Sequence, residues 1–135
     1  TVLITGALDI AVEPLRPLFD HIIAARIDST NGKLTGEMLD VPPTGEVRAQ
    51  LMMDWAEQNG FDLQQGVAYA DSASDLPMLE AVGYPVAVNP ETRLVTIAER
   101  RGWLTENWPK TAGAPKPLLP MGQRPKSRPI PESVR

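Results

Sequence analysis

The residues best suited to chemistry are two carboxylates four positions apart, Asp71 and Asp75. Asp71 follows an apolar run that predicts a strand over 66–71, and Asp75 begins a short amphipathic pattern that predicts a helix over 75–82. Carboxylates beside a turn at the carboxyl end of a strand are the hard oxygen ligands that Mg²⁺ prefers, and open parallel sheets bind ligands at that edge. By themselves, the same two residues also fit the simpler roles of turn residue and helix cap.

Strand-like and helix-like segments alternate along the chain with short connections, which predicts an α/β fold with a parallel sheet flanked by helices. The strand over 66–71 is apolar on both faces, as in a sheet that is covered on both sides. The remaining expected segments are a strand at 1–5 ending in a turn at Gly6, a helical stretch at 11–19, a strand at 20–26, a hairpin at 26–38, a helix at 45–58, a strand at 85–89 and a helix at 90–101.

Turn and cap residues set the expected bounds of these segments. Asn31-Gly32 is the strongest short signal for a hairpin turn. Thr44 is expected to cap the helix that begins at Gly45, and Ser74 is expected to cap the helix that begins at Asp75. Asn89, followed by a proline, is expected to open the last helix.

Composition excludes several classes of function. The net charge of −4 argues against nucleic acid as a main partner. The chain has no cysteine, which rules out disulfides, thiolate zinc sites and cysteine nucleophiles within it. A reducing compartment is therefore permitted, and we expect a cytoplasmic protein. No apolar run approaches the roughly 18–20 residues of a membrane span, and no signal-peptide pattern opens the chain.

The end of the chain differs in composition from the rest. Half of the fourteen prolines fall within residues 108–135, whereas residues 1–107 carry the apolar periodicity. We therefore expect one core over 1–107 and an extended or disordered proline-rich tail over 108–135. Trp103 and Trp108 are expected to fasten the start of the tail. Residues 116–120, Lys-Pro-Leu-Leu-Pro, fit a loose proline-rich ligand pattern, but the tail could equally wrap over its own domain.

Three motifs together resemble the haloacid dehalogenase superfamily of phosphohydrolases, in particular its phosphoserine-phosphatase-like subgroup. The run Asp71-Ser-Ala-Ser-Asp75-Leu-Pro-Met-Leu, followed by Ala-Val-Gly-Tyr-Pro-Val-Ala-Val-Asn-Pro, resembles the fourth family motif. Val-Leu-Ile-Thr5-Gly6 resembles the second motif, and Gly45-Glu-Val-Arg48 resembles the third. The resemblance runs from residue 1 to about residue 103 and implies a Rossmann-like core.

The resemblance implies hydrolysis of a small phosphorylated metabolite. In this family an aspartate attacks the phosphoryl group, Mg²⁺ offsets the charge, and water hydrolyses the resulting aspartyl-phosphate. Asp71 would ligate Mg²⁺, and Asp75 would ligate it or orient its waters.

The other matched residues would contact the phosphate. The Thr5 hydroxyl and the Gly6 amide would donate hydrogen bonds to phosphate oxygens, and Arg48 would neutralise the phosphate and the nucleophile. The family usually has lysine where this chain has Arg48. Ser74 would contact substrate or cap the helix. Without the resemblance, Thr5 fits a structural strand end and Arg48 fits a solvated charge.

One family motif is absent from these residues. The first motif, Asp-x-Asp followed by a small residue and Thr, carries the nucleophile on the central strand of the sheet, and the sequence contains no Asp-x-Asp. We therefore expect that strand to come from a longer polypeptide or from another chain. The substrate-selecting cap is absent too. The alternative is a catalytically inactive scaffold or interaction module. Such a module could be fused to another enzyme, for example an acyltransferase or a reductase.

Overall fold

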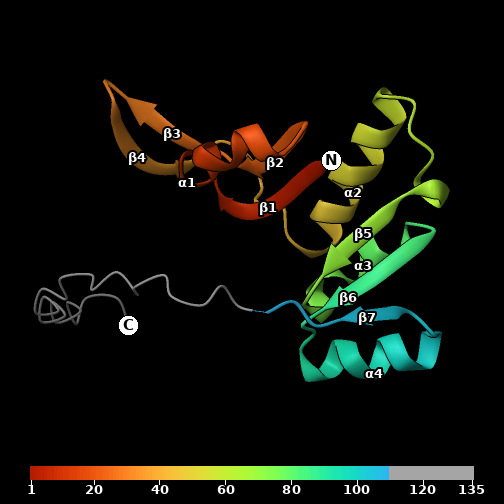
Figure 1. Cartoon of the computed structure of the whole chain (residues 1–135). Coiled ribbons are helices and arrows are strands. Elements are labelled where there is room, and N and C mark those ends of the chain that lie inside the picture. The colour runs from red at the N-terminus through yellow and green to blue at the C-terminus, as the bar shows by residue number, and fades with distance from the viewer. Residues whose placement is uncertain (110–135) are drawn as a thin grey trace, which may run out of the picture.

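The strands of this protein form three separate sheets, as the computed structural model shows for residues 1–109 (Figure 1). The predicted proline-rich tail lies outside these described residues from position 110 onward. Two of these sheets are parallel, one of two strands and one of three, and together with the helices they confirm the expected α/β class. The strands are β1 (Val2–Leu8), β2 (His21–Ala25), β3 (Ile27–Thr30), β4 (Lys33–Met38), β5 (Val67–Ala70), β6 (Tyr84–Val88) and β7 (Leu104–Glu106). The α-helices are α1 (Asp9–Val12), α2 (Gly45–Gln58), α3 (Leu76–Glu80) and α4 (Thr92–Arg101).

The first strand is longer than predicted. It was expected to end at the turn of Gly6, but β1 continues to Leu8. The register against β2 shifts between Thr5, which pairs with Ala24, and Leu8, which pairs with Ala25. Gly6 therefore lies in an irregular part of the strand, where the pairing is interrupted without ending it.

The hairpin forms as predicted. Asn31 and Gly32 join β3 to β4 with φ angles of 52° and 74°. Positive φ at both positions is what a tight turn between right-twisted strands requires, and asparagine and glycine adopt it most readily.

The core lies between β5, β6 and the helices α2, α3 and α4. Leu79 and Leu94 are its largest fully buried side chains. Strand β7 was not predicted, because it has only three residues and two of them are polar. Among the helices of the described residues, none has the length and apolar character needed to cross a membrane. The buried cluster comprises Ala49, Met52, Ala68, Met78, Leu79, Val82, Ala87, Leu94 and Ala98.

The predicted caps are partly wrong. Thr44 occupies the N-cap position of α2, but its side chain makes no capping hydrogen bond. The cap of the turn before α3 is Ser72 and not Ser74, because the Ser72 hydroxyl accepts a bond from the Ser74 amide at 3.2 Å. The Asn89 side chain does not cap α4. It bonds instead to the backbone of Trp108, at 2.9 and 3.0 Å, so Trp108, which was predicted to fasten the start of the tail, is held against the domain.

An apolar cavity of about 600 Å³ separates the two parallel sheets. It is lined by residues of β1 and of β5, and the two strands are not hydrogen-bonded to each other. Strand β5 was expected to be covered on both faces, but Val67 is 53% exposed and Tyr69 is 52% exposed. Both residues border the cavity, so this face of β5 lacks the neighbour that would cover it.

Candidate functional site

Asp71 and Asp75 lie together at the carboxyl end of β5, as predicted. Asp71 is the first residue after the strand and is exposed. Asp75 closes a 3₁₀ turn, η3 (Ala73–Asp75), and is only 4% exposed. Burial raises the pKa of the Asp75 carboxyl, Arg48 opposes that rise, and the negative charge of Asp71 adds to it.

Arg48 forms a buried ion pair with Asp75. One terminal guanidinium nitrogen donates to Asp75 Oδ1, and Nε donates to the Pro43 carbonyl at 3.1 Å. The Arg48 and Asp75 side chains are 17% and 6% exposed. Arg48 is thus not a solvated surface charge. It joins the first turn of α2 to the loop that follows β5.

Thr5 and Gly6 reach the same end of the molecule through the loop that precedes α2. A Cβ at Gly6 would lie 3.1 Å from Thr44 Cγ2, so β1 packs directly against this loop. A Cβ at Gly45 would lie 3.7 Å from the Ser74 carbonyl oxygen, so the start of α2 lies beside the Asp71–Asp75 loop. The Thr5 hydroxyl accepts a bond from the Ala7 amide at 3.1 Å. Ser74 is exposed.

Glu91 is a residue of this region that sequence reasoning missed. The sequence pattern places it only within the helix predicted over 90–101. Its carboxylate accepts a hydrogen bond from the Ala73 amide at 2.7 Å and one from the Ser72 hydroxyl at 3.4 Å. An available signal was its position three residues after β6, which places it at the same sheet edge as Asp71.

The carboxylates of residues 1–109 are too few to hold a metal ion by themselves. Within residues 1–109, no group of three or more His, Cys, Asp or Glu side chains could hold a metal ion. Asp71 is exposed, whereas Asp75 is engaged by Arg48. Mg²⁺ is usually held by one or two carboxylates, with waters and substrate phosphate completing the octahedron. The donor set therefore fits Mg²⁺ if a further carboxylate comes from outside these residues.

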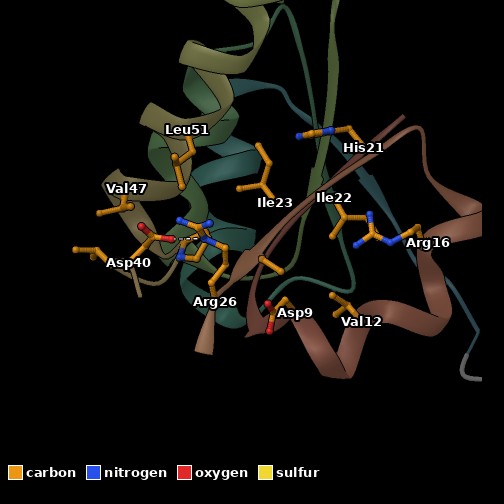
Figure 2. A pocket seen from close by; sticks show the side chains of 13 residues that line it. Asp9, Val12, Arg16, His21, Ile22, Ile23, Arg26, Asp40, Val47 and Leu51 are labelled. Atoms are coloured by element: carbon orange, nitrogen blue, oxygen red, sulfur yellow. Dashed lines mark hydrogen bonds and ion pairs between the residues drawn. The ribbon is translucent and has the colours of Figure 1, made fainter. Parts of the chain in front are cut away.

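A second cavity, of about 720 Å³, lies along β2 (Figure 2). Figure 2 shows Val47 and Leu51 of α2 on one side, and Asp9 and Val12 of α1 on the other. An Arg26–Asp40 ion pair borders it. None of the predicted site residues lines this cavity, although Pro43, whose carbonyl accepts a hydrogen bond from Arg48, does.

Comparison with known families agrees with the fold. The sequence model of the haloacid dehalogenase-like hydrolases matches residues 1–80. The chain belongs to this family. Among solved structures, a Bordetella pertussis protein of unknown function is similar with a TM-score of 0.70 and 30% identity, covering 78% of this chain and 49% of that one. A substrate-bound phosphoserine phosphatase has a TM-score of 0.62 at 24% identity, covering the same shares, and shows similarity of fold.

Curated relatives are considerably longer than this chain. The inhibition of morphological differentiation protein of Streptomyces azureus is 41% identical over 95 residues, or 68% of this chain and 34% of that protein. The phosphoserine phosphatase SerB1 of Mycobacterium tuberculosis is 36% identical over 100 residues, or 74% of this chain and 28% of that protein. The chain thus spans about a third of these relatives.

Proposed function

We propose that this chain forms part of a Mg²⁺-dependent phosphomonoesterase that works through an aspartyl-phosphate and whose nucleophile lies on a strand outside this chain. The observation that carries the proposal is the buried Arg48–Asp75 pair beside the exposed Asp71, at the carboxyl end of a parallel strand. The similarity to SerB1 and to phosphoserine phosphatase structures supports a small phosphorylated metabolite as substrate. We call the chain together with the proposed strand the complete protein.

Each residue of the site would have a separate role in catalysis. Asp71 would provide a metal ligand, and Asp75 would act through the metal's waters or through Arg48. A bound Mg²⁺ would supply positive charge at the phosphate and orient it for in-line displacement. Arg48 would place its remaining guanidinium donors against the phosphate. The Thr5 hydroxyl, the Gly6 amide and Ser74 would complete the contacts with phosphate or substrate, as the family motifs imply.

The cavity between β1 and β5 supports the proposed strand. Parallel strands are hydrogen-bonded at a spacing of roughly 4.8 Å, and a buried backbone group left without a partner costs about 1–3 kcal/mol. The facing strands present apolar side chains to the cavity, among them Leu3 and Ile4 of β1 and Val67 of β5. A strand placed there would pair with both edges and carry Asp-x-Asp-x-Thr to the end where Asp71 lies. Such a strand would come from the same longer polypeptide or from another chain.

The proposed function predicts loss of turnover when Asp71 is changed. In the complete protein, Asp71→Asn should lower the rate of p-nitrophenyl phosphate hydrolysis at limiting Mg²⁺ by at least about 100-fold, because metal binding is weakened. Glu99→Gln, which removes an exposed carboxylate on α4, should leave the rate unchanged. Equal rates for Asp71→Asn and the parent protein would refute the role of Asp71. A parent protein that is inactive despite an intact Asp-x-Asp segment would favour the scaffold alternative.

A further inference from the structure

Glu91 makes three hydrogen bonds to three consecutive residues of the loop after β5. Its backbone amide donates to the Asp71 carbonyl at 2.9 Å. Its carboxylate Oε1 accepts from the Ala73 amide at 2.7 Å and from the Ser72 hydroxyl at 3.4 Å. A residue from the segment after β6 therefore fixes the backbone on both sides of Ser72.

We infer that Glu91 is a positioning residue that holds the Asp71–Asp75 loop in the conformation needed for metal binding. This inference rests on the proposed function. The Asp71 side chain is exposed, so the direction of its carboxylate depends on the backbone that carries it. The turn η3 that follows has only three residues, and hydrogen bonds in a 3₁₀ turn have poorer geometry than those in an α-helix. A charge-assisted bond from Glu91 to the Ala73 amide adds a constraint from outside the loop.

The backbone on both sides of Glu91 is itself held in place. Helix α4 begins directly after Glu91, and its Leu94 and Ala98 are fully buried in the core. Before Glu91, the side chain of Asn89 is bonded to the backbone of Trp108. A contact that starts from an anchored element transmits its geometry to the loop, because the anchored end does not move to accommodate it.

Glu91 could instead act as a direct metal ligand or as a purely electrostatic group. As a direct metal ligand, Glu91 would have to use Oε2, because Oε1 already accepts two donors in this loop. As a purely electrostatic group it would act through its charge. Burial and the charge of Asp71 raise the pKa of Asp75, and the charge of Glu91 adds a smaller rise. Glutamine separates these roles, because it keeps an acceptor oxygen for the Ala73 amide and removes the charge.

The test compares Glu91→Gln, Glu91→Ala and Glu91→Asp in the complete protein, with Glu99→Ala on the exposed face of α4 as the matched control. Mg²⁺ binding is measured by calorimetry, and kcat and KM are measured with p-nitrophenyl phosphate. We expect Glu91→Ala to weaken Mg²⁺ binding by about 10- to 100-fold, the usual effect of removing a group that orients a metal ligand. Glu91→Gln should stay close to the parent, Glu91→Asp should fall between, and KM at saturating Mg²⁺ should be unchanged.

A second readout does not depend on activity. The Ala73 amide should exchange with solvent slowly in the parent protein and in Glu91→Gln, and rapidly in Glu91→Ala. Mg²⁺ affinity in Glu91→Ala equal to that of the parent would overturn the inference, as would a Glu91→Gln variant as impaired as Glu91→Ala. A parent protein that binds no Mg²⁺ and has no activity would instead overturn the proposed function, and with it the role of Glu91 in metal binding.

Discussion

Arg48 joins two parts of the site in a way that lysine could not. Its guanidinium donates to the Pro43 carbonyl through Nε and to Asp75 through a terminal nitrogen. The planar fork makes both bonds at once, whereas a lysine ammonium is a point charge on a flexible stem. The departure from the family's usual lysine is therefore compatible with the geometry. It adds a backbone contact to the ion pair.

This pair predicts a pH-dependent loss of stability when Arg48 is removed. Arg48→Met in the complete protein should lower the free energy of unfolding by about 3–5 kcal/mol at pH 7.5, because a buried carboxylate loses its partner. Burial already raises the pKa of Asp75, so its native state holds the proton more tightly than the unfolded state. The protonated Asp75 carboxyl therefore contributes to the free energy of unfolding at acid pH, and this contribution is lost as pH rises through the native pKa of Asp75. Without Arg48 that pKa rises further.

The destabilisation should therefore be smaller at pH 4.5 than at pH 7.5. Urea unfolding of the parent and of Arg48→Met at both values measures the difference. Arg93→Met, at an exposed position of α4, serves as the control and should change little. A destabilisation by Arg48→Met that is the same at both pH values would mean that Asp75 is not the group left unpaired.

At the scale of elements, Gly83 allows the segment between α3 and β6 to lie directly against η2 (Leu63–Gln65). A Cβ at Gly83 would be 1.9 Å from the Gln64 carbonyl oxygen, and the Gly83 amide donates to the Leu63 carbonyl at 3.0 Å. Because the obstructing atom belongs to the backbone, it cannot rotate away. Gly83→Ala should destabilise the complete protein by about 1–3 kcal/mol or more.

Thermal unfolding of Gly83→Ala and of Gly60→Ala in the complete protein provides the comparison. Gly60 has a φ of 69°, and a Cβ at this position would have no neighbouring atom within 4 Å, so its substitution carries backbone strain without a clash. We expect the larger drop in melting temperature for Gly83→Ala. A smaller drop than for Gly60→Ala would show that the segment can move away from η2.

Local signals predicted the elements well, and contacts between distant segments account for what they missed. Asn31-Gly32 fixed the hairpin and the apolar pattern fixed α2, because both depend on neighbouring residues. The role of Asn89 was misassigned because its partner, Trp108, lies 19 positions away. The sequence predicted that Asp71 and Asp75 lie at the same strand end, because both follow the same strand within a few residues. Glu91 was missed because its contact depends on how two successive strand ends meet.

At the scale of the whole molecule, the described residues hold two parallel sheets with unpaired edges facing a common cavity. Figure 1 shows β1 and β2 apart from the side-by-side strands β5, β6 and β7. The cavity is bordered by Leu3 and Ile4 of β1 and by Val67 and Tyr69 of β5. Apolar surface of this kind is unfavourable in water. Under the proposed function, stability and catalysis therefore depend on the same added strand.

The most direct test is amide hydrogen exchange at residues 2–5 and 67–70, measured in residues 1–135 alone and in the complete protein. We expect the amides facing the cavity to exchange rapidly in the isolated chain and to be strongly protected in the complete protein, because the added strand accepts their hydrogen bonds. If residues 1–135 alone, as a monomer, protect these amides equally and melt cooperatively, no outside strand is needed and the proposed function is contradicted.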